Sequence, residues 1–100
     1  MDLQLRDKVA IVTGSSKGLG LASATALVEE GARVTICARG DAALQTAAVA
    51  LRALAGRPDA VLAVNADVST AEGAAAVVAQ TVETFGRLDI LVNNVGKAGG

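Results

Sequence analysis

The residues with the clearest chemical potential are 13 to 20, which read TGSSKGLG between a short apolar run and an alanine-rich segment. A helix that begins directly after such a turn exposes unpaired backbone amides and the positive end of its dipole, and both favour phosphate. Gly14 permits the sharp turn, Gly18 lets the backbone approach phosphate, and Gly20 lets the helix pack closely against a strand. The stretch predicts a diphosphate-binding turn, with a purely structural tight bend as the alternative.

The composition argues against several other kinds of site. The 100 residues are 52% hydrophobic and 19% charged, with a net charge of −1, no histidine and one cysteine. We therefore expect no metal site, no disulfide, no nucleic-acid partner and no membrane span, and a cytoplasmic location. Cys37 ends an apolar run with no histidine to activate it, so a small core residue is the preferred interpretation over a nucleophile.

The hydrophobic pattern also predicts the elements that position the glycine turn. Short apolar runs rich in Val, Ile and Leu predict four strands, each covered on both faces. These strands are residues 8–13, 33–37, 60–65 and 88–93. Segments with helical spacing separate them, and the first runs from about Gly18 to Glu30 and ends at Gly31.

Two further helices are predicted from their caps and apolar spacing. Asp41 is expected to cap the second, which ends before Gly56 and Pro58. Its predicted buried face consists of Leu44, Ala47, Ala48, Leu51 and Leu54.

The third helix is expected to open with a capping box made by Ser69 and Glu72 and to end at Gly86. Gly73 inside it should cost about 1 kcal/mol relative to alanine. Its predicted buried stripe consists of Ala75, Val78, Val82 and Phe85.

Alternating strands and helices of this kind predict an α/β fold with a parallel sheet and right-handed crossovers. We expect residues 1–100 to form a single Rossmann-type, doubly wound domain with three intervening helices.

Three motifs in this order resemble the short-chain dehydrogenase/reductase family. They are the TGxxxGxG pattern at 13–20, the Asp67-Val68 pair after the third strand, and NNVG at 93–96. The resemblance implies a strand order of 3-2-1-4, with a nicotinamide dinucleotide lying across the carboxyl ends of the strands. Val95 departs from the family's alanine, which puts the fine geometry of the last motif in question.

The resemblance also implies a set of cofactor-binding residues. The turn would surround the diphosphate and the adenosine ribose, the Asp-Val pair would border adenine, and the last motif would approach the riboses. This set is Thr13, Gly14, Ser15, Ser16, Lys17, Gly18, Leu19, Gly20, Asp67, Val68, Asn93, Asn94 and Gly96. For Asn93 and Asn94, hydrogen bonds that tie the fourth strand to its neighbours are an equally good interpretation.

The charges near this set favour NADP(H) over NAD(H). Proteins that prefer NAD usually carry a carboxylate at the end of the second strand, where it repels a 2′-phosphate. Here Arg39 stands at that position, and Lys17 adds a positive charge in the turn. Each alone would also be an ordinary surface charge, and Asp41 could reach a ribose instead of capping its helix.

The family's proton-transfer groups are missing from these 100 residues. The family uses a serine, a tyrosine and a lysine in a YxxxK arrangement, whereas this sequence has no tyrosine, and Lys8, Lys17 and Lys97 fit no such pattern. We expect the cofactor-binding half of an oxidoreductase that moves a hydride between NADP(H) and a carbonyl or alcohol substrate, inactive by itself and with no catalytic residue of its own. The complete enzyme is expected to bind a small-molecule substrate and to be a homo-oligomer.

Two alternatives remain, a non-catalytic nucleotide-binding module and an inactive fragment that binds nothing. The apolar run at 88–93 looks suited to a central strand, yet nothing in the sequence is left to pair with its outer edge. The isolated chain is therefore expected to be marginally stable, self-associating or dependent on a partner.

Overall fold

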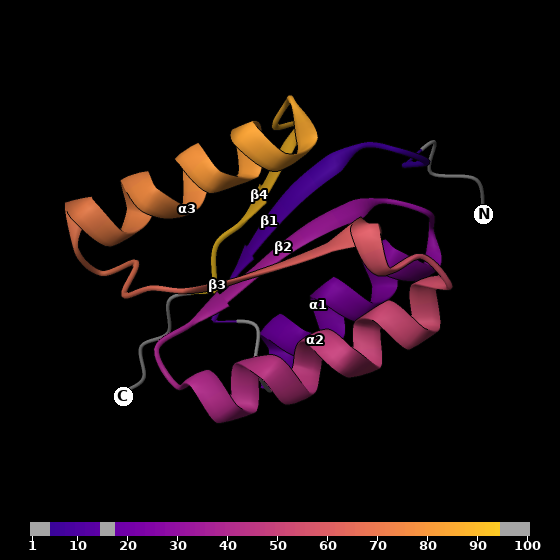
Figure 1. Cartoon of the computed structure of the whole chain (residues 1–100), viewed down its shortest axis with the longest axis horizontal. Coiled ribbons are helices and arrows are strands. Elements are labelled where there is room, and N and C mark those ends of the chain that lie inside the picture. Colours follow the sequence, from indigo (N-terminus) through magenta and orange to yellow (C-terminus); the bar gives the residue numbers. More distant parts are fainter. Residues whose placement is uncertain (1–4, 15–17, 95–100) are drawn as a thin grey trace.

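The computed structural model describes residues 5–14 and 18–94, and these form three layers (Figure 1). The elements in chain order are β1 (Val9–Thr13), α1 (Gly18–Glu29), β2 (Arg33–Ala38), α2 (Asp41–Ala55), the 3-10 turn η1 (Pro58–Ala60), β3 (Val61–Asn65), α3 (Ala71–Phe85) and β4 (Ile90–Val92). In the described part of the chain the strands make one parallel sheet in the order β3-β2-β1-β4. The predicted α/β fold and strand order are confirmed, with strand ends shifted by one or two residues.

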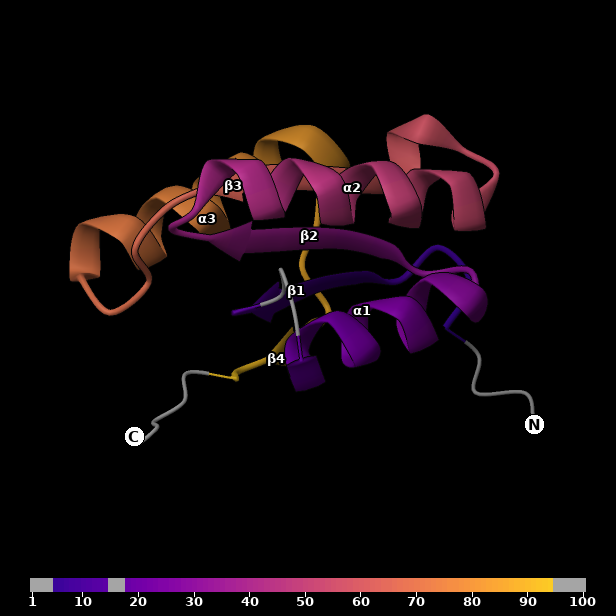
Figure 2. The same cartoon turned by 90° about the horizontal axis from the view of Figure 1, so that it is seen from below.

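The helices cover the two faces of the sheet unequally. Figures 1 and 2 show α1 and α2 on one face and α3 on the other. Successive residues of a strand point to opposite faces, so Val12 and Ile36 join the core under α1 and α2, while Ile11 and Cys37 join the core under α3. All five residues of β1 are buried, as expected of a strand with neighbours on both edges and helices on both faces. None of the helices in the described residues is long and apolar enough to cross a membrane.

Both predicted helix caps are wrong by one residue. Gly40, not Asp41, is the N-cap of α2, and no side-chain hydrogen bond caps this helix within the described chain. Thr70, not Ser69, is the N-cap of α3, where its Oγ1 accepts the Gly73 amide hydrogen at 2.9 Å. Candidate caps stand side by side in both segments, and the backbone path decides between them.

The predicted buried stripe of α3 is also wrong. Val78 and Val82 are each 43% exposed, whereas Val77 and Thr81 are buried against the sheet. Thr81 Oγ1 lies 2.8 Å from Thr35 Oγ1 in β2 and 2.7 Å from the Val77 carbonyl oxygen, so a buried hydrogen-bonded pair faces inward. Ala75 is exposed and Phe85 is half-buried.

The prediction for α2 was closer to the structure. Leu44, Ala47, Ala48 and Leu51 are buried as expected, and Leu54 differs, since it is 47% exposed. It lies in the last turn of the helix, where the neighbouring Ala55 packs against the core instead.

Gly73 allows a close approach at the first turn of α3. A Cβ atom there would lie 1.9 Å from the Asp67 carbonyl oxygen and 2.6 Å from its carbonyl carbon. Glycine is therefore needed here for the tight contact with the loop that carries Asp67, although it has the expected cost in a helix.

Candidate functional site at the carboxyl ends of the strands

A hollow of about 360 Å³ lies where the carboxyl ends of β1, β2 and β3 meet. Because all four strands are parallel, the loops after them gather at this one edge of the sheet. The lining residues are Gly14, Cys37, Ala38, Arg39, Ala66, Asp67, Val68, Ser69 and Asn94. The structure thus brings together five of the predicted site residues, from four loops.

Thr13 joins the end of β1 to the end of β4. Its Oγ1 accepts the Asn94 amide hydrogen at 2.7 Å and lies 3.1 Å from Asn93 Oδ1. The structural interpretation of Asn93, as a tie between neighbouring strands, is therefore confirmed. Thr13 itself is 5% exposed, so its hydroxyl holds the two strand ends together from inside the protein.

Gly14 lies against Asn94 at the bottom of the hollow. Its φ of +58° is in the left-handed region, and an added Cβ would stand 3.0 Å from the Asn94 carbonyl oxygen. Glycine is needed here both for the backbone angle and for the contact.

Among the described residues, the amide nitrogen of the Asn94 side chain has no acceptor. Asn94 Nδ2 is buried and makes no hydrogen bond among the described residues. Buried donors are nearly always paired in folded proteins, and leaving one unpaired costs about 1–3 kcal/mol. This donor lies in a residue that lines the hollow.

The start of α1 provides the other part of the glycine turn. Gly18 begins the helix with a φ of +63°, and Gly20 is buried. No described atom lies within 4 Å of a Cβ built on Gly18, so the backbone angle favours glycine there. Leu19 is 80% exposed and takes no part in the core. The predicted site residues Ser15, Ser16, Lys17 and Gly96, together with Val95, lie outside the described residues.

Arg39 and Asp67, which both line the hollow, form an exposed ion pair. Arg39 Nη1 lies 3.9 Å from Asp67 Oδ2, and the arginine side chain is 79% exposed. The other oxygen, Asp67 Oδ1, accepts hydrogen bonds from the hydroxyl and the amide of Ser69. These bonds, with a smaller contribution from the Arg39 charge, hold the pKa of the Asp67 carboxyl below its ordinary value. An ion pair this exposed is weak, so the guanidinium remains available to another anion.

Cys37 belongs to the core, as predicted. Its thiol is buried and donates to the Val12 carbonyl oxygen at 3.6 Å. Burial raises the pKa of this thiol, and a hydrogen bond from the Gly14 backbone lowers it by less. A thiol in this state is a poor nucleophile.

Sequence reasoning missed two polar residues around the hollow. Ser69 follows Asp67 by two positions, the spacing of an Asx turn, and this spacing could have indicated its hydrogen bond. Asn65 ends β3, and its side chain donates to the Arg39 carbonyl oxygen at 3.3 Å. The position of Asn65, a polar residue at the end of an apolar strand, could have indicated such a contact.

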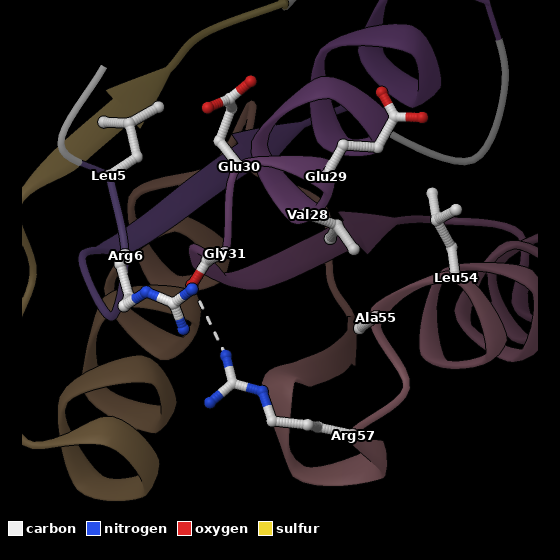
Figure 3. Close-up of a pocket in the computed structure, with 9 residues that line it drawn as sticks. All are labelled: Leu5, Arg6, Val28, Glu29, Glu30, Gly31, Leu54, Ala55 and Arg57. Atoms are coloured by element: carbon white, nitrogen blue, oxygen red, sulfur yellow. Dashed lines mark hydrogen bonds between the residues drawn. The ribbon is translucent and has the colours of Figure 1, made fainter. Parts of the chain in front are cut away.

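A larger hollow of about 560 Å³ lies at the opposite edge of the sheet and includes none of the predicted site residues (Figure 3). It is bordered by Leu5, Arg6, Val28, Glu29, Glu30, Gly31, Leu54, Ala55 and Arg57. Arg57 donates to the Gly31 carbonyl oxygen at 3.4 Å, the bond drawn in Figure 3. The charged residues of this hollow are of both signs and lie in the turn before β1 and at or just after the ends of α1 and α2, an arrangement that selects no particular ligand.

Known proteins are similar to this chain in sequence and in fold. A family model described as short chain dehydrogenase matches residues 8–100. An uncharacterized oxidoreductase of Methylorubrum extorquens is 46% identical over 94 residues, which are 93% of this chain and 37% of the relative's length. The 11-beta-hydroxysteroid dehydrogenase A of Sesamum indicum is 47% identical over 89 residues, or 89% of this chain and 25% of that protein.

A solved structure agrees over the same span. L-sorbose reductase from Gluconobacter frateurii, complexed with NADPH and L-sorbose, matches with a TM-score of 0.92 and 44% identity. The match covers 99% of this chain and 37% of that one. The chain therefore spans well under half the length of the relatives that it matches.

Proposed function

The chain belongs to the short-chain dehydrogenase family of oxidoreductases, and on that premise we propose that it supplies the dinucleotide-binding half of an enzyme acting on a carbonyl or alcohol. The observation that carries this proposal is the hollow in which Gly14, Arg39, Asp67 and Asn94 come together. It lies at the carboxyl ends of the strands, where open parallel sheets bind their ligands.

Two features of the described chain fit a nicotinamide dinucleotide. Asn94 Nδ2 is a buried donor without a partner among the described residues, and a dinucleotide is rich in acceptor oxygens. Gly14 presents bare backbone where a side chain would close the space toward Asn94. We assign the turn at 13–20 to the diphosphate, Asp67 and Val68 to adenine, and Asn93, Asn94 and Gly96 to the riboses.

NADP(H) is the proposed cofactor in preference to NAD(H). Residues 37–40 at the end of β2 include no carboxylate, and the exposed guanidinium of Arg39 lies beside the hollow. Arginine binds phosphate through several donors in a fixed plane. The L-sorbose reductase structure, which is complexed with NADPH, supports the same choice.

When bound, the nicotinamide ring supplies the hydride, and the residues of this chain hold the rest of the molecule. The proton that accompanies the hydride has no evident carrier here, because the 100 residues contain neither tyrosine nor histidine. The Thr13 hydroxyl is already hydrogen-bonded at the end of β4, and the Ser69 hydroxyl donates to Asp67. We therefore propose that this chain binds the cofactor without turning over a substrate.

The test is a pair of calorimetric titrations with NADPH and NADH at fixed ionic strength, on the unchanged chain and on Arg39→Asp. We expect the unchanged chain to bind NADPH about ten- to hundredfold more tightly, since hydrogen bonds to a charged group contribute about 1.5–3 kcal/mol. Arg39→Asp should reverse the order, because a carboxylate repels the 2′-phosphate and can hold ribose hydroxyls. Equal affinities that the substitution does not change would refute the NADP(H) assignment.

The lack of a tyrosine favours a second candidate, a nucleotide-binding module with no chemistry. Both candidates bind the dinucleotide. They differ when the chain is mixed with a separately produced carboxyl-terminal portion of a relative, since only the half-enzyme should then oxidise NADPH in the presence of a carbonyl compound.

A further inference from the structure

The side chain of Asn65 bridges the place where β2 and β3 separate. Asn65 pairs with Ala38 at the end of the ladder, and one more backbone bond, from the Ala66 amide to the Ala38 carbonyl oxygen at 3.1 Å, closes it. Beyond this point β2 continues into α2 and β3 turns toward Asp67. Asn65 Nδ2 lies 3.3 Å from the carbonyl oxygen of Arg39 and 3.5 Å from Asp41 Oδ1. One amide group thus reaches the residues on both sides of Gly40.

Gly40 has no side chain that could fix this turn. Its φ of −90° and ψ of 112° place it in the extended region, and no described atom lies within 4 Å of a Cβ built there. Since Gly40 contributes no side-chain cap to α2, its own chemistry does little to fix the direction in which Arg39 leaves the sheet. Asn65 provides a restraint that the glycine cannot.

The same contact holds a carboxylate in place. Asp41 Oδ1 accepts a hydrogen bond from Gln45 Nε2 at 3.4 Å in addition to the one from Asn65. Asp41 is the acid that follows Arg39 most closely in the sequence. A carboxylate released here would favour ribose hydroxyls and disfavour a 2′-phosphate. Both contacts of Asn65 therefore act in the same direction on the choice of cofactor.

We propose that Asn65 is a positioning residue that sets the preference for NADP(H) by holding the Arg39–Asp41 turn in register with the end of β3. Asn65 acts through Arg39 and Asp41 and does not itself bind the phosphate. This inference rests on the proposed function, because it assumes that Arg39 binds the 2′-phosphate.

The experiment compares the ratio of NADPH to NADH affinity in the unchanged chain and in Asn65→Ala, by calorimetry at one ionic strength. Asn65 is exposed, so the variant should fold, and circular dichroism checks that it does. We expect the ratio to fall about three- to tenfold, the value of one or two hydrogen bonds. Thr46→Ala is the matched control, because it removes another exposed side-chain bond, to the Ala42 carbonyl oxygen in α2, and leaves the turn intact.

A double-mutant cycle separates positioning from a general structural effect. In an Arg39→Ala background, Asn65→Ala should change the ratio by less than it does in the unchanged chain, because only its action through Asp41 remains. If Asn65→Ala instead weakens NADPH and NADH equally, its role is structural and the inference is wrong. If the unchanged chain binds neither dinucleotide, or binds both alike, the proposed function or its NADP(H) assignment fails first and the inference fails with it.

Discussion

At the scale of single residues, Gly14 carries the tightest constraint in the candidate site. It turns the chain out of β1 and lies against the Asn94 carbonyl oxygen at the same time. The end of β4 can approach β1 only if this position lacks a side chain. Thr13, one residue earlier, then closes the contact with its hydroxyl.

Replacing Gly14 with alanine should affect both stability and binding. A left-handed backbone angle costs a non-glycine residue about 1–2 kcal/mol, and we expect the free energy of unfolding to fall by that amount in urea denaturation. The added Cβ presses on Asn94 beside the hollow, so NADPH affinity should fall about tenfold or more.

Gly56→Ala is the control for strain alone. Gly56 has a similar φ of +70°, yet no described atom lies within 4 Å of its Cβ position. This variant should lose similar stability and keep its NADPH affinity. Undiminished binding by Gly14→Ala, measured beside it, would show that the glycine turn does not hold the cofactor.

Single residues also show where prediction from sequence reached its limit. The glycines at 13–20 indicated the turn, because Gly14 and Gly18 adopt left-handed backbone angles that favour glycine. The caps of α2 and α3 were missed by one position each, since Asp41 stands next to Gly40, and Ser69 next to Thr70, which can cap as well. The role of Asn65 depends on how the ends of β2 and β3 meet, and no local pattern records that, whereas the bond of Ser69 to Asp67 follows a local spacing that was overlooked.

At the scale of elements, the alternation of strands and helices was predictable because each strand is a short apolar run between glycines and polar residues. The facing of α3 was not. Its apolar residues suggested a stripe through Val78 and Val82, but Thr81 turns inward to meet Thr35 and Gly73 fits against the Asp67 carbonyl. The apolar residues of α3 would have allowed either face of the helix to be buried. The polar contact of Thr81 and the close approach of Gly73 decide which face it is.

Gly73→Ala tests that approach. Alanine in a helix is ordinarily favoured over glycine by about 1 kcal/mol, whereas here the Cβ would overlap backbone atoms of Asp67. We expect thermal and urea unfolding to show a loss of about 2 kcal/mol, the usual cost of overpacking. Ala79→Gly, on the exposed side of the same helix, should lower the free energy of unfolding by about 1 kcal/mol, the ordinary cost of glycine in a helix. A Gly73→Ala variant as stable as the unchanged chain would mean that α3 does not start where the structure places it.

At the scale of the whole molecule, the described sheet has an edge strand on each side, β3 and β4, and β4 carries an exposed leucine. Among the described residues no strand pairs with the outer edge of β4, and Leu91 in that strand is 61% exposed. Val78 and Val82 of α3 are apolar and exposed as well. An open edge with apolar side chains is a surface on which chains associate.

We expect the 100-residue chain to self-associate with increasing concentration in sedimentation velocity experiments. Leu91→Lys should raise the monomer fraction, because a charge on an edge strand opposes pairing with another strand. Leu54→Lys makes the same change on α2, at a residue 47% exposed, and should leave the association as it was. A single monomeric species at all concentrations of the unchanged chain would contradict the expectation.

The strand order also has a consequence for how the protein is made. Thr13 meets its partner Asn93 from 80 positions away, so this contact cannot form until residue 93 has been added. At about 5–20 residues per second, a ribosome needs roughly 4–16 s to add that stretch. β1, β2 and β3 are available to pair before then, and the Asn94 wall of the hollow forms only after residue 94 has been added. In a nascent chain the first three strands could therefore assemble before the hollow takes its full shape.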